Sequence, residues 1–102
     1  MAPRLGDART LTYSARIRIY GKVQGVWFRG WMVRKAGTLG LRGWVRNRLD
    51  GSVEALLVGD PVAVRKMVER CHDGPPAARV DRIEEQPGTD PVPSRFEQMP
   101  TC

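Results

Sequence analysis

This chain has few of the residues that build a covalent or metal-based scaffold. It contains two cysteines and a single histidine among 102 residues. Cys71 falls within a helical pattern and Cys102 is the last residue, so neither number nor spacing predicts a disulfide framework or a zinc site. A chain of this length can bury a sufficient hydrophobic core without disulfide bonds or a structural metal. We therefore expect one domain that needs no metal and no other cofactor.

Long apolar segments are also missing. No apolar run approaches the length that crosses a membrane, and no charged leader precedes an apolar stretch. There are no internal repeats and no low-complexity segments. Residues 1–12 show no sustained periodicity, which predicts a flexible N-terminal extension ahead of a domain at 13–102. We expect a cytoplasmic protein without membrane contact, and, because no coiled-coil or long edge-pairing pattern is present, a monomer.

The most informative segment is residues 21–29, GKVQGVWFR. It connects a predicted strand at 16–20 to a predicted helix at 28–39. Its two glycines let the backbone adopt φ > 0, so that successive N–H groups can converge, and the first turn of a helix adds unpaired donors. Arg29 adds a planar fork suited to two oxygens of one phosphate. The segment predicts an anion site; the alternative is a plain strand-to-helix turn with a solvated arginine.

A second segment, residues 41–54, predicts a β-hairpin. Asp50-Gly51 lies between two β-type runs and predicts a two-residue turn joining strands at 43–49 and 52–58. Asn47 follows Val45 by two residues and therefore shares its face of the sheet. If Val45 points at the core beneath the helices, Asn47 points toward the helix layer too. The alternative is a turn-adjacent asparagine that makes only local bonds.

Acidic residues are outnumbered, 11 against 17 Lys plus Arg, which gives a net charge of +6 and a pI near 10.2. This balance would suit nucleic-acid binding, but the basic residues are scattered along the chain rather than gathered in one patch, and we expect no nucleic-acid partner. Some belong to elements that we expect to converge on the anion site, where they would attract a doubly charged substrate. For all but Arg29 a solvated surface position is an equal alternative. These residues are Arg16, Arg18, Lys22, Arg29, Arg46 and Arg48.

GKVQGVWFR followed by LGLRGWVRNRLDGSVE resembles the acylphosphatase family, small enzymes that hydrolyse the carboxyl-phosphate anhydride of acyl phosphates. The two blocks match the family's GxVQGVxFR and GWVRNxxDGxVE motifs in order and separation, and the resemblance covers roughly residues 14–97. It implies that Arg29 is the catalytic, phosphate-binding arginine and that Asn47 positions the attacking water. The phosphate cradle would consist of the backbone N–H groups of Gln24, Gly25, Val26, Trp27 and Phe28.

The rest of the chain supplies a scaffold. Asp60 is a natural N-cap and Pro61 fits the first position of a second helix. Strands are predicted at 79–85 and 94–99, with a loop between them. The order β-α-β-β-α-β predicts an α+β fold, a ferredoxin-like split βαβ sandwich in which an antiparallel sheet carries two helices on one face. An added edge strand or a long last connection follows. The apolar stripe of the second helix consists of Val64, Met67, Val68 and Cys71.

One feature departs from the family pattern. The family usually closes with an aromatic, a variable and then an aliphatic residue, whereas here Phe96-Glu97 is followed by Gln98. A polar residue at an inward position makes the register and packing of the closing strand uncertain. The two catalytic blocks are unaffected by this departure.

The implied function is hydrolysis of a small-molecule acyl phosphate to a carboxylate and inorganic phosphate, without metal. An RNA-binding module or a phosphate-binding regulatory module on the same fold are the alternatives. RNA-binding modules of this kind stack bases on aromatic residues of central strands, and the predicted strand 52–58 has none. A simple binding module would not need Asn47. His72, near the end of the second helix, is predicted to be exposed and not catalytic.

Overall fold

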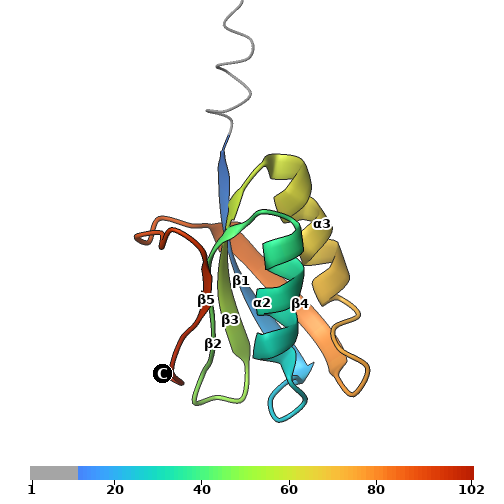
Figure 1. Ribbon diagram of the computed structural model, residues 1–102. Coiled ribbons are helices and arrows are strands. Elements are labelled where there is room, and N and C mark those ends of the chain that lie inside the picture. Colours follow the sequence, from blue (N-terminus) through green and yellow to red (C-terminus); the bar gives the residue numbers. More distant parts are fainter. Residues whose placement is uncertain (1–11) are drawn as a thin grey trace, which may run out of the picture.

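Two helices cover one face of a five-stranded sheet, as predicted, with the strand order β4-β1-β3-β2-β5 (Figure 1). The computed structural model describes residues 12–102, so nearly all of the expected N-terminal extension lies outside the described residues. Among residues 12–102 no helix is long and apolar enough to cross a membrane. The elements are β1 (Tyr13–Lys22), α2 (Phe28–Thr38), β2 (Arg42–Asn47), β3 (Val53–Gly59), α3 (Pro61–Cys71), β4 (Arg79–Pro87) and β5 (Phe96–Gln98).

The fifth strand makes the sheet mixed. The neighbouring pairs among β1 to β4 are antiparallel, but β5 pairs in parallel with β2. β4 and β5 occupy opposite edges of the sheet, and the chain between them crosses the face that carries no helix (Figure 1). There Val92 packs against Trp44, Leu56 and Val58. Because this crossing returns the chain to the end of the sheet where β2 begins, β5 runs in the same direction as β2.

Strict alternation along β1 separates the two faces of the sheet. Ala15, Ile17 and Ile19 are buried in the core beneath the helices, whereas Arg16 and Arg18 between them are only half-buried and lie on the opposite face. The central strand β3 is buried on both faces from Val53 to Val58. The core therefore lies between the helices and the sheet, and a smaller apolar cluster lies on the other side.

The helix ends follow the sequence closely. Asp60 caps α3, since its carboxylate accepts a hydrogen bond of 2.7 Å from the backbone N–H of Val62, and Pro61 is the first helical residue. The α3 stripe is buried as expected. Cys71 in this stripe is a free thiol whose pKa is raised by burial, and Cys102 is a free, exposed thiol. α2 ends at Thr38, one residue before the predicted end.

The β2–β3 hairpin has a three-residue loop, not the two-residue turn predicted from Asp50-Gly51. Arg48 N–H donates to the Ser52 carbonyl at 2.9 Å, which leaves Leu49, Asp50 and Gly51 as the loop. Gly51 has φ 93°, a conformation that suits glycine. The Asp50 carboxylate accepts from both the backbone N–H (2.9 Å) and the hydroxyl (2.6 Å) of Ser52. These side-chain bonds stabilise the longer loop. The turn propensity of Asp50-Gly51, on which the prediction was based, does not account for them.

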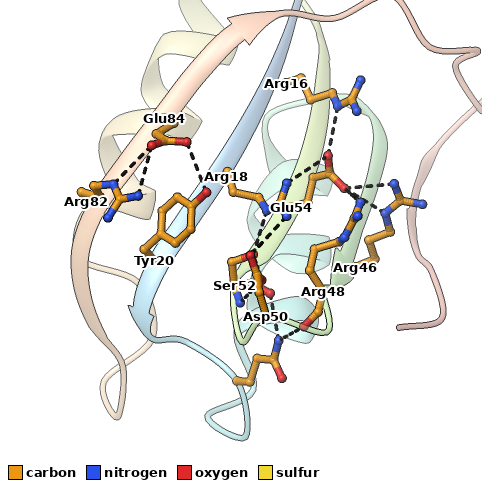
Figure 2. A network of polar contacts seen from close by, with 11 residues as sticks. Arg16, Arg18, Tyr20, Arg46, Arg48, Asp50, Ser52, Glu54, Arg82 and Glu84 are labelled. Atoms are coloured by element: carbon orange, nitrogen blue, oxygen red, sulfur yellow. Dashed lines mark hydrogen bonds and ion pairs between the residues drawn. The ribbon is translucent and has the colours of Figure 1, made fainter. Parts of the chain in front are cut away.

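Four of the six basic residues expected at the anion site lie on the wrong face for that role. Arg16, Arg18, Arg46 and Arg48 surround the buried carboxylate of Glu54 on the face without helices (Figure 2). The Arg48 Nη1–Glu54 Oε1 distance is 2.7 Å, and Arg16 Nε and Arg46 Nε each lie 3.0 Å from a Glu54 oxygen. Strand alternation is the reason, because these residues are out of phase with the core-facing positions.

This network predicts that Glu54 matters for stability. Burial by itself would raise the pKa of the Glu54 carboxyl, but hydrogen bonds from Arg48, Arg16 and Arg46 outweigh it and hold that pKa below its ordinary value. Glu54→Ala should lower the free energy of unfolding by about 3 kcal/mol, because the guanidinium groups are left without their central partner. Denaturant titration by circular dichroism would measure this.

The pH dependence has a defined sign. A carboxyl whose pKa is lowered by folding contributes stability that is complete above its ordinary value of 4.5 and is lost as the pH falls through the lowered value. The stability difference between the parent and Glu54→Gln should shrink over that acidic range. Glu84→Ala, which removes an exposed carboxylate on the same face, is the matched control and should cost less than about 1 kcal/mol. Equal losses for Glu54→Ala and Glu84→Ala would contradict the central role of Glu54.

Candidate active site

The two sequence blocks meet at one end of the sheet. The β1–α2 loop and the β2–β3 hairpin lie side by side there (Figure 1), and the Gln24 side chain bridges them with hydrogen bonds of 2.8 Å to the Arg48 carbonyl and 2.9 Å to the Ser52 carbonyl. Between loop and strand lies a pocket of ≈ 120 Å³. Its lining comes from the β1–α2 loop, the first turn of α2, the end of β2 and β5, and consists of Val23, Gly25, Trp27, Phe28, Arg29, Gly30, Asn47 and Gln98.

The loop backbone is shaped to present N–H groups. Gly25 (φ 74°) and Trp27 (φ 67°) both adopt left-handed conformations, and alternation of this kind turns successive N–H groups to one side. α2 begins at Phe28 without any side-chain cap. Its first intrahelical bond runs from Trp31 N–H to the Trp27 carbonyl at 2.9 Å, so the N–H groups before it have no helical acceptor. The positive end of the helix dipole adds a favourable potential for an anion at the same place.

Arg29 differs from the arginines of the other face. Its guanidinium forms no hydrogen bond or ion pair with any residue from 12 to 102, although it is half-buried in the lining of the pocket. Arg16 and Arg48, in contrast, are paired with Glu54. A half-buried cation without a carboxylate partner, next to unpaired N–H donors, provides a site for an oxyanion.

Asn47 is the last residue of β2, and it lies on the helix-facing side two residues after the fully buried Val45. Its side chain has no hydrogen-bond partner within residues 12–102 and lines the pocket with Arg29. Its backbone carbonyl accepts from Cys102 N–H at 3.0 Å, which holds the strand end. The amide can therefore donate to and accept from a bound molecule in the pocket.

The expected cradle residues have different surroundings. Gly25, Trp27 and Phe28 line the pocket, and the Phe28 side chain also reaches into the core. Gln24 and Val26 are not part of its lining. The Gln24 side chain instead connects the cradle to the hairpin after Asn47, a positioning role that the sequence analysis did not predict. The sequence shows that a glutamine lies in this loop, but it does not indicate which groups the side chain bonds to.

Gln98 also lines the pocket, where the sequence analysis did not place it. The sequence analysis expected this polar residue to point inward and disturb the packing of the closing strand. Instead, Gln98 lies at the edge of the sheet, where it is exposed and lines the pocket together with Asn47. β5 pairs with β2 so that Gln98 lies beside Val45. Phe96, two residues earlier, fills the core instead. The departure from the family pattern therefore places an amide at the site and leaves the core intact.

His72 is exposed at the C-terminal cap of α3 and is not among the pocket residues. In the part of the chain that the structure describes, no three His, Cys, Asp or Glu side chains are grouped as a metal site would require.

Similarity to known proteins agrees with this geometry. The family model described as Acylphosphatase matches residues 15–98. An acylphosphatase of Rhizorhabdus wittichii is 54% identical over 96 residues, which cover 94% of this chain and 97% of the relative. That of Rhodospirillum rubrum is 54% identical over 85 residues, covering 83% and 93% of the two chains.

Solved structures agree as well. The structure of an acylphosphatase from Coxiella burnetii superimposes with a TM-score of 0.83 at 31% identity and covers 88% of this chain and 95% of its own. That from Bacillus subtilis has a TM-score of 0.77 at 36% identity, covering 84% and 97%. The chain therefore belongs to the acylphosphatase family. It is an enzyme that hydrolyses acyl phosphates.

Proposed function

We propose that Arg29 and the backbone N–H groups of the β1–α2 loop hold the phosphoryl group, while Asn47 positions the attacking water. The observation that carries this proposal is the unpaired, half-buried guanidinium of Arg29 in the same pocket as the unpaired amide of Asn47. The guanidinium fork and the N–H groups bind the equatorial oxygens of phosphorus and stabilise the charge that they carry in the transition state.

The water oxygen forms a bond to phosphorus, and the bond from phosphorus to the acyl oxygen breaks, with its electron pair leaving on the carboxylate. A carboxylate is a good leaving group, so the reaction needs mainly positioning and charge stabilisation. Asn47 orients the water through its carbonyl oxygen and N–H group. An amide does not remove a proton at neutral pH, so the proton of the water passes to an oxygen of the substrate.

The alternative functions are not favoured. On the open face the central strand β3 presents Glu54, Leu56 and Val58, where an RNA-binding sheet would display aromatic residues. The aromatic rings of Trp44 and Tyr20 on the neighbouring strands are covered by the guanidinium groups of Arg46 and Arg82. Four arginines of that face are paired with Glu54, Asp50 or Asp90, namely Arg16, Arg18, Arg46 and Arg48. Their charges are therefore engaged within the fold and less available to a nucleic acid.

We also propose a cytoplasmic monomer. A buried thiol at Cys71 and an exposed one at Cys102, both free, suit a reducing compartment. The exposed edge strand β4 is rich in charged side chains such as Arg79, Asp81 and Arg82, which oppose edge-to-edge pairing. Light scattering after size exclusion should give the mass of one chain, and the mass of a dimer would contradict the proposal.

The function is tested by hydrolysis of an aryl acyl phosphate by the purified protein, with an aryl phosphate monoester as the control. Selective turnover of the acyl phosphate is expected, because its carboxylate leaves easily and the site offers no strong acid to assist a poorer leaving group. Equal turnover of the two, or turnover of the monoester alone, would contradict the proposed chemistry.

Catalysis should not depend on the histidine, on the cysteines or on added metal. Activity should remain within a few-fold of the parent in the presence of a chelator, for His72→Ala and for the double change Cys71→Ala with Cys102→Ala. Cys71→Ala should cost some stability because the side chain is buried, so folding is monitored alongside activity. Loss of activity in a folded His72→Ala variant, or on chelation, would mean that other groups carry the chemistry.

A further inference from the structure

The pocket is too small to enclose a whole acyl phosphate with a large acyl group. Its volume of ≈ 120 Å³ is well below the roughly 300–1,000 Å³ of typical small-molecule sites. Under the proposed function, Arg29 and Asn47 hold the phosphoryl group and the water in this space. The acyl group must then lie at the pocket mouth. Apart from Gly25, the lining residues that are exposed, and so form the mouth, are Trp27 and Gln98.

Trp27 is held in an unusual conformation at this mouth. It is the one non-glycine residue with positive φ (67°) in the described chain, and a bulky residue rarely adopts that region. Its side chain remains 57% exposed. Strained residues of this kind concentrate at ligand sites, where the surrounding structure enforces them. The conformation therefore points to a role beyond packing.

Two residues of α2, Gly30 and Arg34, hold the indole of Trp27 in position. It packs on Gly30 so closely that a Cβ added there would lie 2.1 Å from the indole Nε1. The Arg34 guanidinium lies 5.6 Å from the centre of the ring, within the range of a cation–π contact. The ring is therefore held against the first turns of α2, while more than half of the residue's surface stays accessible.

We propose that Trp27 is the acyl-side contact of this site and that it makes the enzyme favour acyl phosphates with flat, apolar acyl groups, such as aromatic ones, over acetyl phosphate. This inference rests on the proposed function of the pocket. An aromatic acyl group can cover the exposed indole and remove both surfaces from water, whereas an acetyl group covers little of it.

Gln98 supplies the polar part of the same subsite. Its exposed carboxamide has no hydrogen-bond partner within residues 12–102, so its N–H groups are free to donate. Every acyl phosphate carries a carbonyl oxygen next to the bond that breaks, and this oxygen is the acceptor for Gln98. Gln98 thus serves all acyl phosphates alike, and Trp27 distinguishes among them.

The test compares benzoyl phosphate with acetyl phosphate as substrates of the parent and of Trp27→Gly. Glycine accepts φ 67° without strain, so this variant should fold. The expected result is a roughly tenfold fall in the ratio of kcat/KM for benzoyl phosphate to kcat/KM for acetyl phosphate, because the variant keeps the backbone N–H of position 27 and loses the indole. Val62→Ala shortens an apolar side chain of α3 at a residue that is 64% exposed, and it is the matched control. It should leave kcat/KM unchanged for both substrates.

The outcomes separate this inference from the function on which it rests. If the parent hydrolyses neither acyl phosphate, the proposed function fails and the inference with it. If the parent hydrolyses both but Trp27→Gly leaves the ratio of the two kcat/KM values unchanged, the inference about Trp27 alone is overturned. Gln98→Leu should lower kcat/KM for both substrates with unchanged phosphate inhibition; parent-like values for both would overturn the role of Gln98.

Discussion

Arg29→Ala should remove most of the activity, by about 3 kcal/mol or more in transition-state stabilisation, which is more than a hundredfold in kcat/KM. The guanidinium is the unpaired cation of the pocket, and it meets the phosphoryl oxygens in both the ground state and the transition state. Affinity for inorganic phosphate, measured as competitive inhibition or by calorimetry, should therefore fall together with turnover.

Arg29→Lys should fail nearly as badly, because an ammonium group keeps the charge but lacks the planar fork. Arg65→Ala is the matched control. It removes an arginine of α3 from a weak surface ion pair with Glu85 of β4 and should leave both turnover and phosphate affinity unchanged. Parent-like hydrolysis by either Arg29 variant would refute the assignment of the phosphate site.

Asn47→Ala should lower kcat by roughly a hundredfold or more while leaving phosphate affinity nearly unchanged. The amide is expected to hold the water and not the phosphoryl group, so its loss removes an interaction that only the reaction requires. Parallel measurement of kcat and of phosphate inhibition separates the two effects. Asn47→Ala should lower kcat alone, whereas Arg29→Ala should lower both kcat and the affinity for phosphate.

The control for Asn47 tests whether the hairpin itself has been disturbed. Leu49→Ala trims an 88% exposed side chain two residues further along the same hairpin and should keep full activity. If Asn47→Ala folds normally but no longer binds phosphate, Asn47 belongs to the phosphate cradle and the water must be positioned by another group.

Local sequence patterns predicted much of the fold, and the structure places Arg29 and Asn47 in one pocket. The strand at 16–20, the helix start at Phe28 and the Asp60-Pro61 helix start depend on neighbours within a few residues, and the structure has each of them as expected. Asn47 was assigned to the helix side from its phase with Val45, and it is there.

The features that were missed depend on contacts between distant segments. Gln98 reaches the pocket because β5 pairs in parallel with β2 after the chain crosses the sheet, a register that composition does not encode. The arginines around Glu54 were assigned by element, whereas strand phase determines their face. The hairpin loop is longer than predicted because Asp50 bonds to Ser52 through its side chain. Tertiary pairing and side-chain bonds decide such details.

Titration of the isotopically labelled protein with inorganic phosphate, followed by nuclear magnetic resonance, tests the central claim most directly. The phosphate cradle consists of backbone N–H groups, and this method observes each of them. Saturable shifts should be largest at the amides of residues 24–29 and at the Arg29 side chain, with Arg16, Arg46 and Arg48 unaffected because Glu54 already holds them. The largest shifts on the Glu54 face, or no saturable shift at residues 24–29, would contradict the account.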